Sequence, residues 1–468
     1  MRYILNYFRW IPCGLLIYTI ASALVVLTRA APTQEAKVSF TKELIPLFRR
    51  SCMGCHQPAK AKGGLDLTTY TALLKGGKHA PALVPKDAKV SRLIKEISGE
   101  EPSMPEEGEP LTTVEVALVS RWITEGAIDD TPPGGFVHRL AAPPVYPALP
   151  AISALAWSPQ GTVLAVAGWH EVILYSGASN TILARLVGDS PRIESIAFSP
   201  DGTRLAVAGG APSEYGEVQI WDTTNYKCLQ SIKTTADVVF GVSWSPNSQR
   251  VAIGCADKMA RVFSVADGVE IMKCDNHIDW VFATAWSQDG ARLVTASRDR
   301  ALKLIDVASG HLVDDVNRQG DPLISLARHP TENLVVCGNT TGSPRVYRME
   351  PRGGRLAEGD DKENSFVREL QRLPGALQTL AWSGDGRWIA AGSSGAAVWV
   401  FNAADGGRKV SLKWTGGPVF AVAFQPSGEV LAVGGSDGKI RFFDFAKDKL
   451  LREMDGVPLT GAAVSPTR

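Results

Sequence analysis

The stretch AFSPDG at residues 197–202 decides the fold, because variants of it recur along most of the chain. The other copies are AWSPQG from 156, SWSPNS from 243, AWSQDG from 285, ARHPTE from 327, AWSGDG from 381, AFQPSG from 423 and AVSPTR from 463. Successive copies start 40 to 54 residues apart, and most intervals lie near 42. A fixed period of this length indicates a repeat architecture.

The residues between the copies predict β-strands. After each copy except the last comes an alternating apolar run that ends in small residues, such as LAVAGG at 205–210. A second alternating run follows, such as VQIWD at 218–222. A period near 42 residues with about four short strands per repeat is typical of a β-propeller. Residues 151–468 are therefore predicted to form an all-β propeller of seven blades, or of eight if the final LTGAAVSP (459–466) adds one.

These repeats resemble the WD-repeat family, with a strongly altered consensus. The Trp-Asp dipeptide survives once, as Trp221-Asp222. Elsewhere the tryptophan position holds Phe263, Ile305, Phe401 or Phe443. The resemblance implies a platform for a protein partner on one propeller face, and a fold alone gives no chemistry.

Blade four keeps most of the buried hydrogen-bonding set of that family, as His277, Ser297 and Asp299. Ile305 replaces the usual tryptophan, so this set is expected to be incomplete. We interpret His277 as structural. The remaining propeller histidines have no neighbours that indicate ligation of a metal or second cofactor; they are His170, His311 and His329.

A second informative stretch, SCMGCHQPAKAKGG at 51–64, places Cys52, Cys55 and His56 together. The pattern fits a redox disulfide, half a zinc site or a covalent haem attachment. No second C-x-x-C completes a four-thiolate zinc site, and no βαβ pattern surrounds the motif. Covalent attachment of one haem c is therefore favoured.

Helical patterns flank this motif. Phe40, Leu44 and Phe48 share one face of a short helix that runs into the attachment turn. Downstream, Thr112 and Glu115 form a capping box, and an apolar face of Val116, Val119, Trp122 and Ile123 follows before a C-terminal Gly126. Residues 37–130 are thus predicted to form a small all-α domain.

The haem iron would take His56 as its proximal ligand. Met53 lies between the two cysteines and cannot reach the opposite side of the haem. Met104, on a loop bracketed by Pro102 and Pro105, is the favoured distal ligand, and His79 is the alternative. The two predicted iron ligands are therefore His56 and Met104.

Several segments in order resemble the planctomycete-type cytochrome c domain: CMGCHQPAKAKGGLDLTTYTALLKGG, then PALVP, SRLIKEI, PSMP and RWITEGA. The resemblance covers about 90 residues. It implies that Cys52, Cys55 and His56 attach haem and that Met104 is the distal ligand.

The N-terminus, the segment between the two domains and the net charge predict where the protein is located and how it is organised. Arg2 and Arg9 precede an apolar run from Ile11 to Leu27, so residues 1–31 are predicted to be a signal peptide or an uncleaved membrane anchor. The remainder would then lie in the periplasm or cell envelope. Residues 131–150 contain six prolines and are predicted to be a semi-rigid linker. A formal net charge of +1 gives no indication of nucleic-acid binding.

These features predict a multidomain, exported c-type cytochrome that transfers single electrons to or from a redox partner protein, with the propeller as interaction platform. Two alternatives remain open at this point. The propeller could hold a second cofactor or a substrate of a haem-containing oxidoreductase, or the chain could be a non-redox scaffold. No catalytic residue is assigned, because no nucleophile elbow, paired carboxylates or metal cluster stands out in the propeller sequence.

Overall fold

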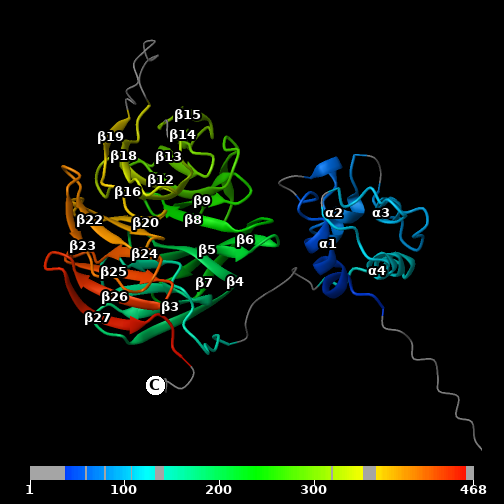
Figure 1. Cartoon of the computed structure of the whole chain (residues 1–468), viewed down its shortest axis with the longest axis horizontal. Helices are drawn as coiled ribbons and strands as arrows, with labels where there is room; N and C mark the ends of the chain where they lie inside the picture. The colour runs from blue at the N-terminus through cyan, green and yellow to red at the C-terminus, as the bar shows by residue number, and fades with distance from the viewer. Residues whose placement is uncertain are drawn as a thin grey trace, which may run out of the picture.

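The computed structural model describes residues 37–57, 61–78, 81–106, 108–131, 142–317, 320–351 and 365–459. Figure 1 shows a small helical region and a larger region of β-strands. The predicted signal or anchor (1–31), His79 and the final repeat motif beyond Leu459 lie outside the described residues. No helix in the described ranges is long and apolar enough to span a bilayer.

The helical region contains short elements connected by long turns. They are a π-helical turn (Phe40–Leu44), α1 (Ile45–Ser51), a 3-10 turn (Lys62–Gly64), α2 (Tyr70–Lys75), α3 (Arg92–Ile97) and α4 (Thr113–Thr124). The predicted apolar face of Phe40, Leu44 and Phe48 is fully buried. The predicted single helix is nevertheless divided, because Pro46 in the first turn of α1 has no N–H to continue the preceding hydrogen-bond pattern.

Helix α4 follows the predicted capping box, in which Thr112 and Glu115 satisfy each other's backbone N–H groups. Val119, Trp122 and Ile123 are buried, whereas Val116 of the predicted face is only half-buried. The Trp122 ring stacks on Phe40 with centroids 5.4 Å apart. This contact joins the last helix to the segment that leads into the turn at residues 52–56, called the Cys52 turn below.

The described strands form six antiparallel sheets, in which neighbours in sequence are neighbours in space. The first sheet contains β1 (Leu155–Trp157), β2 (Val163–Ala167), β3 (Trp169–Ser176), β4 (Ile182–Phe198), β5 (Arg204–Ala211), β6 (Tyr215–Asp222) and β7 (Cys228–Thr235). The second contains β8 (Val239–Trp244), β9 (Arg250–Cys255), β10 (Ala260–Ser264) and β11 (Glu270–Cys274). The third contains β12 (Val281–Trp286), β13 (Arg292–Ser297), β14 (Leu302–Asp306) and β15 (Leu312–Asp315).

The last three sheets repeat this arrangement. The fourth contains β16 (Leu323–Arg328), β17 (Leu334–Asn339), β18 (Arg345–Arg348) and β19 (Phe366–Glu369). The fifth contains β20 (Leu377–Trp382), β21 (Trp388–Ser393), β22 (Val398–Asn402) and β23 (Arg408–Ser411). The sixth contains β24 (Val419–Phe424), β25 (Val430–Gly435), β26 (Lys439–Asp444) and β27 (Lys449–Asp455). The first sheet spans two sequence repeats, because the 17-residue strand β4 runs from one repeat into the next.

The recurring serine builds the turn that follows the first strand of a repeat. The Ser199 hydroxyl donates to Asp201 Oδ1 at 2.6 Å and accepts from the Arg204 N–H at 3.0 Å. The same two bonds recur at Ser245, Ser287 and Ser383. The motif therefore recurs because each such turn needs a hydroxyl and a side-chain acceptor two residues later.

The recurring tryptophan links three of the sheets to the sheet before each of them. The indole N–H of Trp244 donates to the Ala197 carbonyl, that of Trp286 to Ser243, and that of Trp382 to Ala327, at 2.8–3.2 Å. Because these contacts join consecutive sheets, the repeat motif specifies packing between sheets as well as the turn within each one.

Contacts also connect the first and last sheets. Ile152, Trp157 and Phe442 belong to one buried apolar cluster. The Tyr175 hydroxyl donates to the Gly456 carbonyl at 3.1 Å. Tyr146, from the proline-rich segment, packs in the same cluster.

Candidate functional site

The Cys52 turn is fixed by backbone hydrogen bonds at the end of α1. The Cys52 N–H donates to the Phe48 carbonyl at 2.7 Å, and the N–H groups of Cys55 and His56 both donate to the Cys52 carbonyl at 3.1 Å. The Leu67 N–H then donates to the His56 carbonyl at 3.0 Å. These bonds hold two half-buried thiols and one imidazole in a compact turn.

A cavity of about 370 Å³ opens beside this turn. Cys52, Cys55, His56 and Met104 all line it. Its volume lies in the range of pockets that hold small molecules and cofactors, roughly 300–1,000 Å³. The structure therefore brings the four sequence-predicted site residues to one cavity, whereas His79 lies outside the described residues.

His56 carries a polar atom that the protein itself leaves unused. Its Nδ1 is buried and has no hydrogen-bond partner among the described residues. A buried polar atom without a partner costs about 1–3 kcal/mol, so such atoms call for an explanation. The ring of His56 lines the cavity, and an imidazole at such a position fits a side chain that binds a metal.

Met104 and Met53 occupy different environments. Met104 is half-buried and lines the cavity, and its N–H donates to the Glu96 carbonyl at 2.9 Å. Met53 is 3% exposed and packs in the helical core instead. The prediction that Met53 cannot act as the distal ligand agrees with this placement.

The cavity wall is apolar and its rim is charged. Leu65, Leu67, Ala82, Leu93 and Ile97 contribute apolar lining. On the rim, Arg50 pairs with Glu115, Lys62 with Glu106 and Arg92 with Glu96. The sequence analysis did not single out these residues. A helical pattern at Leu93 and Ile97 and the i,i+4 spacing of Arg92 and Glu96 were available as signals. The other two pairs join distant segments and had none.

Burial governs the acidity of the Cys52 thiol. Burial raises its pKa to about 11, and the nearby charge of Arg50 opposes this only in part. The thiol is therefore protonated and weakly nucleophilic at neutral pH. No disulfide joins Cys52 to Cys55.

These observations fit a covalently attached haem. Two thiols, an imidazole and a thioether line the same cavity, as Cys52, Cys55, His56 and Met104. A thioether sulfur and an imidazole are both haem-iron ligands in proteins.

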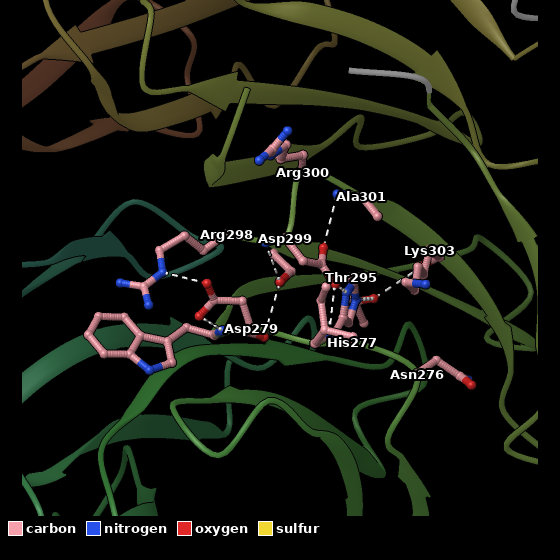
Figure 2. A network of polar contacts seen from close by, with 12 residues as sticks. Asn276, His277, Asp279, Thr295, Arg298, Asp299, Arg300, Ala301 and Lys303 are labelled. Atoms are coloured by element: carbon pink, nitrogen blue, oxygen red, sulfur yellow. Dashed lines mark hydrogen bonds and ion pairs between the residues drawn. The ribbon is translucent and has the colours of Figure 1, made fainter. Parts of the chain in front are cut away.

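The His277 network in the third sheet has a different character. His277 Nδ1 bonds Asp299 Oδ2 at 2.8 Å, and Nε2 bonds Thr295 Oγ1 at 2.7 Å (Figure 2). Ser297, which was expected in this set, joins the network through Asp299 and not through the ring: its hydroxyl donates to the Asp279 carbonyl and accepts from the Asp299 N–H at 3.1 Å. Thr295, two residues earlier on the same face of β13, is the side chain that bonds the ring.

Asp299 anchors this network as an anion. Burial alone would raise its pKa, but the hydrogen bond and charge of His277 and the N–H groups of Ala301 and Ile278 hold it at about 2. Both ring nitrogens of His277 are occupied, which supports the structural interpretation of this residue. In the ranges that the structure describes, no group of three His, Cys, Asp or Glu residues is placed to hold a metal ion.

Comparison with known protein families identifies both parts of the chain. Residues 52–108 match the planctomycete cytochrome C family, and residues 268–306, 368–402 and 409–444 match the WD domain, G-beta repeat. Residues 148–278, which include strands β1 to β11, match the family of eukaryotic translation initiation factor eIF2A. No curated protein matches the chain. The chain thus carries a planctomycete cytochrome c domain followed by an eIF2A-like β region and WD repeats.

Proposed function

We propose that this protein is an exported c-type cytochrome that holds one haem covalently and transfers single electrons to or from a redox partner protein. The observation that carries the proposal is the convergence of Cys52, Cys55, His56 and Met104 on one apolar cavity. The family match over residues 52–108 supports it independently.

Each residue has a defined part in this proposal. Cys52 and Cys55 would hold the haem covalently, and His56 and Met104 would be the ligands of its iron. When bound, haem c supplies a reversible one-electron redox centre, and a thioether ligand raises its potential relative to two imidazoles. The apolar lining excludes water from the iron, which keeps both ligand positions closed.

The repeats form, in this proposal, a closed seven-bladed propeller that serves as a platform for a protein partner. The first sheet supplies two blades, since β4 is shared, and the other five supply one each. The apolar cluster that contains both Trp157 and Phe442 supports closure between the first and last blades. Export, which the N-terminal sequence predicts, belongs to the same proposal.

The proposal is tested by electron counting on the full chain produced with a haem-attachment system. Titration of the reduced protein with a one-electron oxidant should remove one electron per chain. Carbon monoxide should leave the reduced spectrum unchanged if both His56 and Met104 ligate the iron. No redox-active haem, or a haem that binds carbon monoxide freely, would contradict the assignment.

A further inference from the structure

The hairpin of β5 and β6 is longer than its counterpart in the second sheet. Each of its strands has eight residues, against six in β9 and five in β10. Pairing continues to Ala211 and Tyr215 at the tip. In Figure 1 this hairpin projects from the β-region toward the helical region.

Buried polar contacts make this hairpin rigid close to its tip. Glu217 is fully buried, and its carboxylate accepts from Ser190 Oγ at 2.7 Å, from Gln219 Nε2 at 2.9 Å and from the Ser231 hydroxyl. A fully bonded buried network of this kind fixes geometry. Gly216 adds a close approach, since a Cβ there would lie 2.2 Å from the Asp237 carbonyl oxygen. The bonds of Glu217 and the close packing at Gly216 therefore fix the direction in which the hairpin extends.

The tip of the hairpin meets the cytochrome domain. Glu214 forms an ion pair with Arg49, near the end of α1. Beside this pair lies a cavity of about 240 Å³ with lining from both domains. Phe40, Met53 and Tyr70 line it from the helical side, and Tyr215 and Lys233 from the hairpin side.

Charges on the two sides of this cavity are complementary. Arg49 of the helical domain faces Glu214 of the hairpin, and both Asp129 of the helical domain and Lys233 of β7 line the cavity. Lys233 also lies over the Tyr215 ring at 4.7 Å from its centroid. Lys233 itself pairs with Asp189 of its own domain, so the Arg49–Glu214 pair is the ion pair that favours one orientation of the two domains.

The cavity of about 370 Å³ beside the Cys52 turn is called the haem cavity below. The contact with the hairpin lies on a different side of α1 and of the turn that follows it. Arg49 and Met53 line the interdomain cavity, whereas Arg50, Cys52 and Cys55 line the haem cavity. The two linings share no residue. Docking at the hairpin therefore leaves the haem cavity accessible.

We propose that the β5–β6 hairpin is a docking site for the chain's own cytochrome domain, which it holds by the Arg49–Glu214 ion pair with the haem cavity left open to a redox partner. The propeller then holds the cytochrome domain, and with it the haem site, in a fixed orientation. This docking does not require haem, because none of its contacts lines the haem cavity.

Small-angle X-ray scattering of the full chain tests the docking. Glu214→Arg and Arg49→Glu should each shift the maximum dimension to longer values, because each places like charges in contact. The double variant Arg49→Glu/Glu214→Arg restores opposite charges and should return to the wild-type profile. Glu429→Arg, at an exposed turn of the last sheet, is the matched control and should not change it.

A second measurement keeps the test independent of folding defects in a variant. Wild-type protein in about 1 M salt, where the Debye length is about 3 Å, should show the same extension as Glu214→Arg. Haem content per chain, measured on the same samples, should be equal in all variants, so a haem defect is separable from a docking defect. Profiles that are identical for Glu214→Arg, Glu429→Arg and the high-salt wild type would overturn the proposal.

Discussion

His56 and Met104 come from separate segments of the chain and line the same cavity. The Cys52 turn positions His56, and the loop after α3 positions Met104 through its backbone bond to Glu96. Because the cavity wall between them is apolar, a haem between the two side chains would be shielded from water.

Substitution of Met104 should change the haem site selectively. Met104→Leu removes the sulfur, so carbon monoxide should bind the reduced protein, and Met104→His should lower the midpoint potential because imidazole replaces a thioether. Visible spectroscopy and potentiometry check both results. Met53→Leu, in the core behind the turn, is the control and should leave spectrum and potential unchanged. Equal spectra for Met104→Leu and wild type would exclude Met104 as a ligand.

The thiol of Cys52 in haem-free protein should react as its raised pKa requires. Because burial raises this pKa to about 11, the thiolate fraction should increase about tenfold per pH unit between pH 8 and 10. Alkylation rates at Cys52, measured by peptide mass spectrometry, should follow this increase. The alkylation rate of a cysteine in unfolded protein should level off near pH 9, since the ordinary pKa of cysteine is about 8.5. A Cys52 rate that levels off at the same pH would show that burial does not control this thiol.

Asp299 should contribute stability that is lost in acid. Its folded-state pKa of about 2 lies below the ordinary 3.8, so the contribution is present above about pH 4 and is lost as pH falls toward 2. The shift corresponds to about 2 kcal/mol. Asp299→Asn should therefore reduce the loss of unfolding free energy between pH 5 and pH 3 in denaturant titrations. Asp448→Asn, at an exposed turn, is the control, and matching pH profiles for the two variants would contradict this account.

The Arg185–Glu171 pair should stabilise the first sheet against unfolding. Glu171 is buried, accepts from the Tyr146 hydroxyl at 2.8 Å and pairs with Arg185, which also donates to the Pro144 carbonyl at 2.7 Å. Arg185→Ala leaves a buried carboxylate without its cation and should cost about 3–5 kcal/mol of unfolding free energy. Lys447→Ala breaks an exposed pair with Asp444 and should have little effect. Comparable midpoints for the two variants in urea would disprove the role of this pair.

The repeats were predictable from sequence because their causes are local. The serine turn is formed by residues within a few positions of one another, as at Ser199, Asp201 and Arg204, so the same letters recur in most repeats. The Cys52 turn and the α4 capping box are equally local, and both appear where the sequence places them.

The remaining features depend on pairings between distant segments. The His277 ring bonds Thr295, whereas Ser297, on the same face of β13, bonds the Asp299 N–H, so strand alternation alone does not identify the partner. The Arg50–Glu115 pair at the haem cavity and the Arg49–Glu214 pair between domains each join separate regions of the fold. No spacing in the sequence encodes such contacts, so the structure was needed to find them.

The central claim is tested most directly by acid-acetone extraction of the full chain produced with a haem-attachment system, followed by intact mass and a reduced-minus-oxidised spectrum. The account predicts that one haem stays on the protein, with a c-type spectrum, and that Cys52→Ser/Cys55→Ser loses it to the solvent. A wild-type chain that carries no haem, or whose haem is extracted as readily as from the double variant, would contradict the assignment of Cys52 and Cys55 as its attachment points.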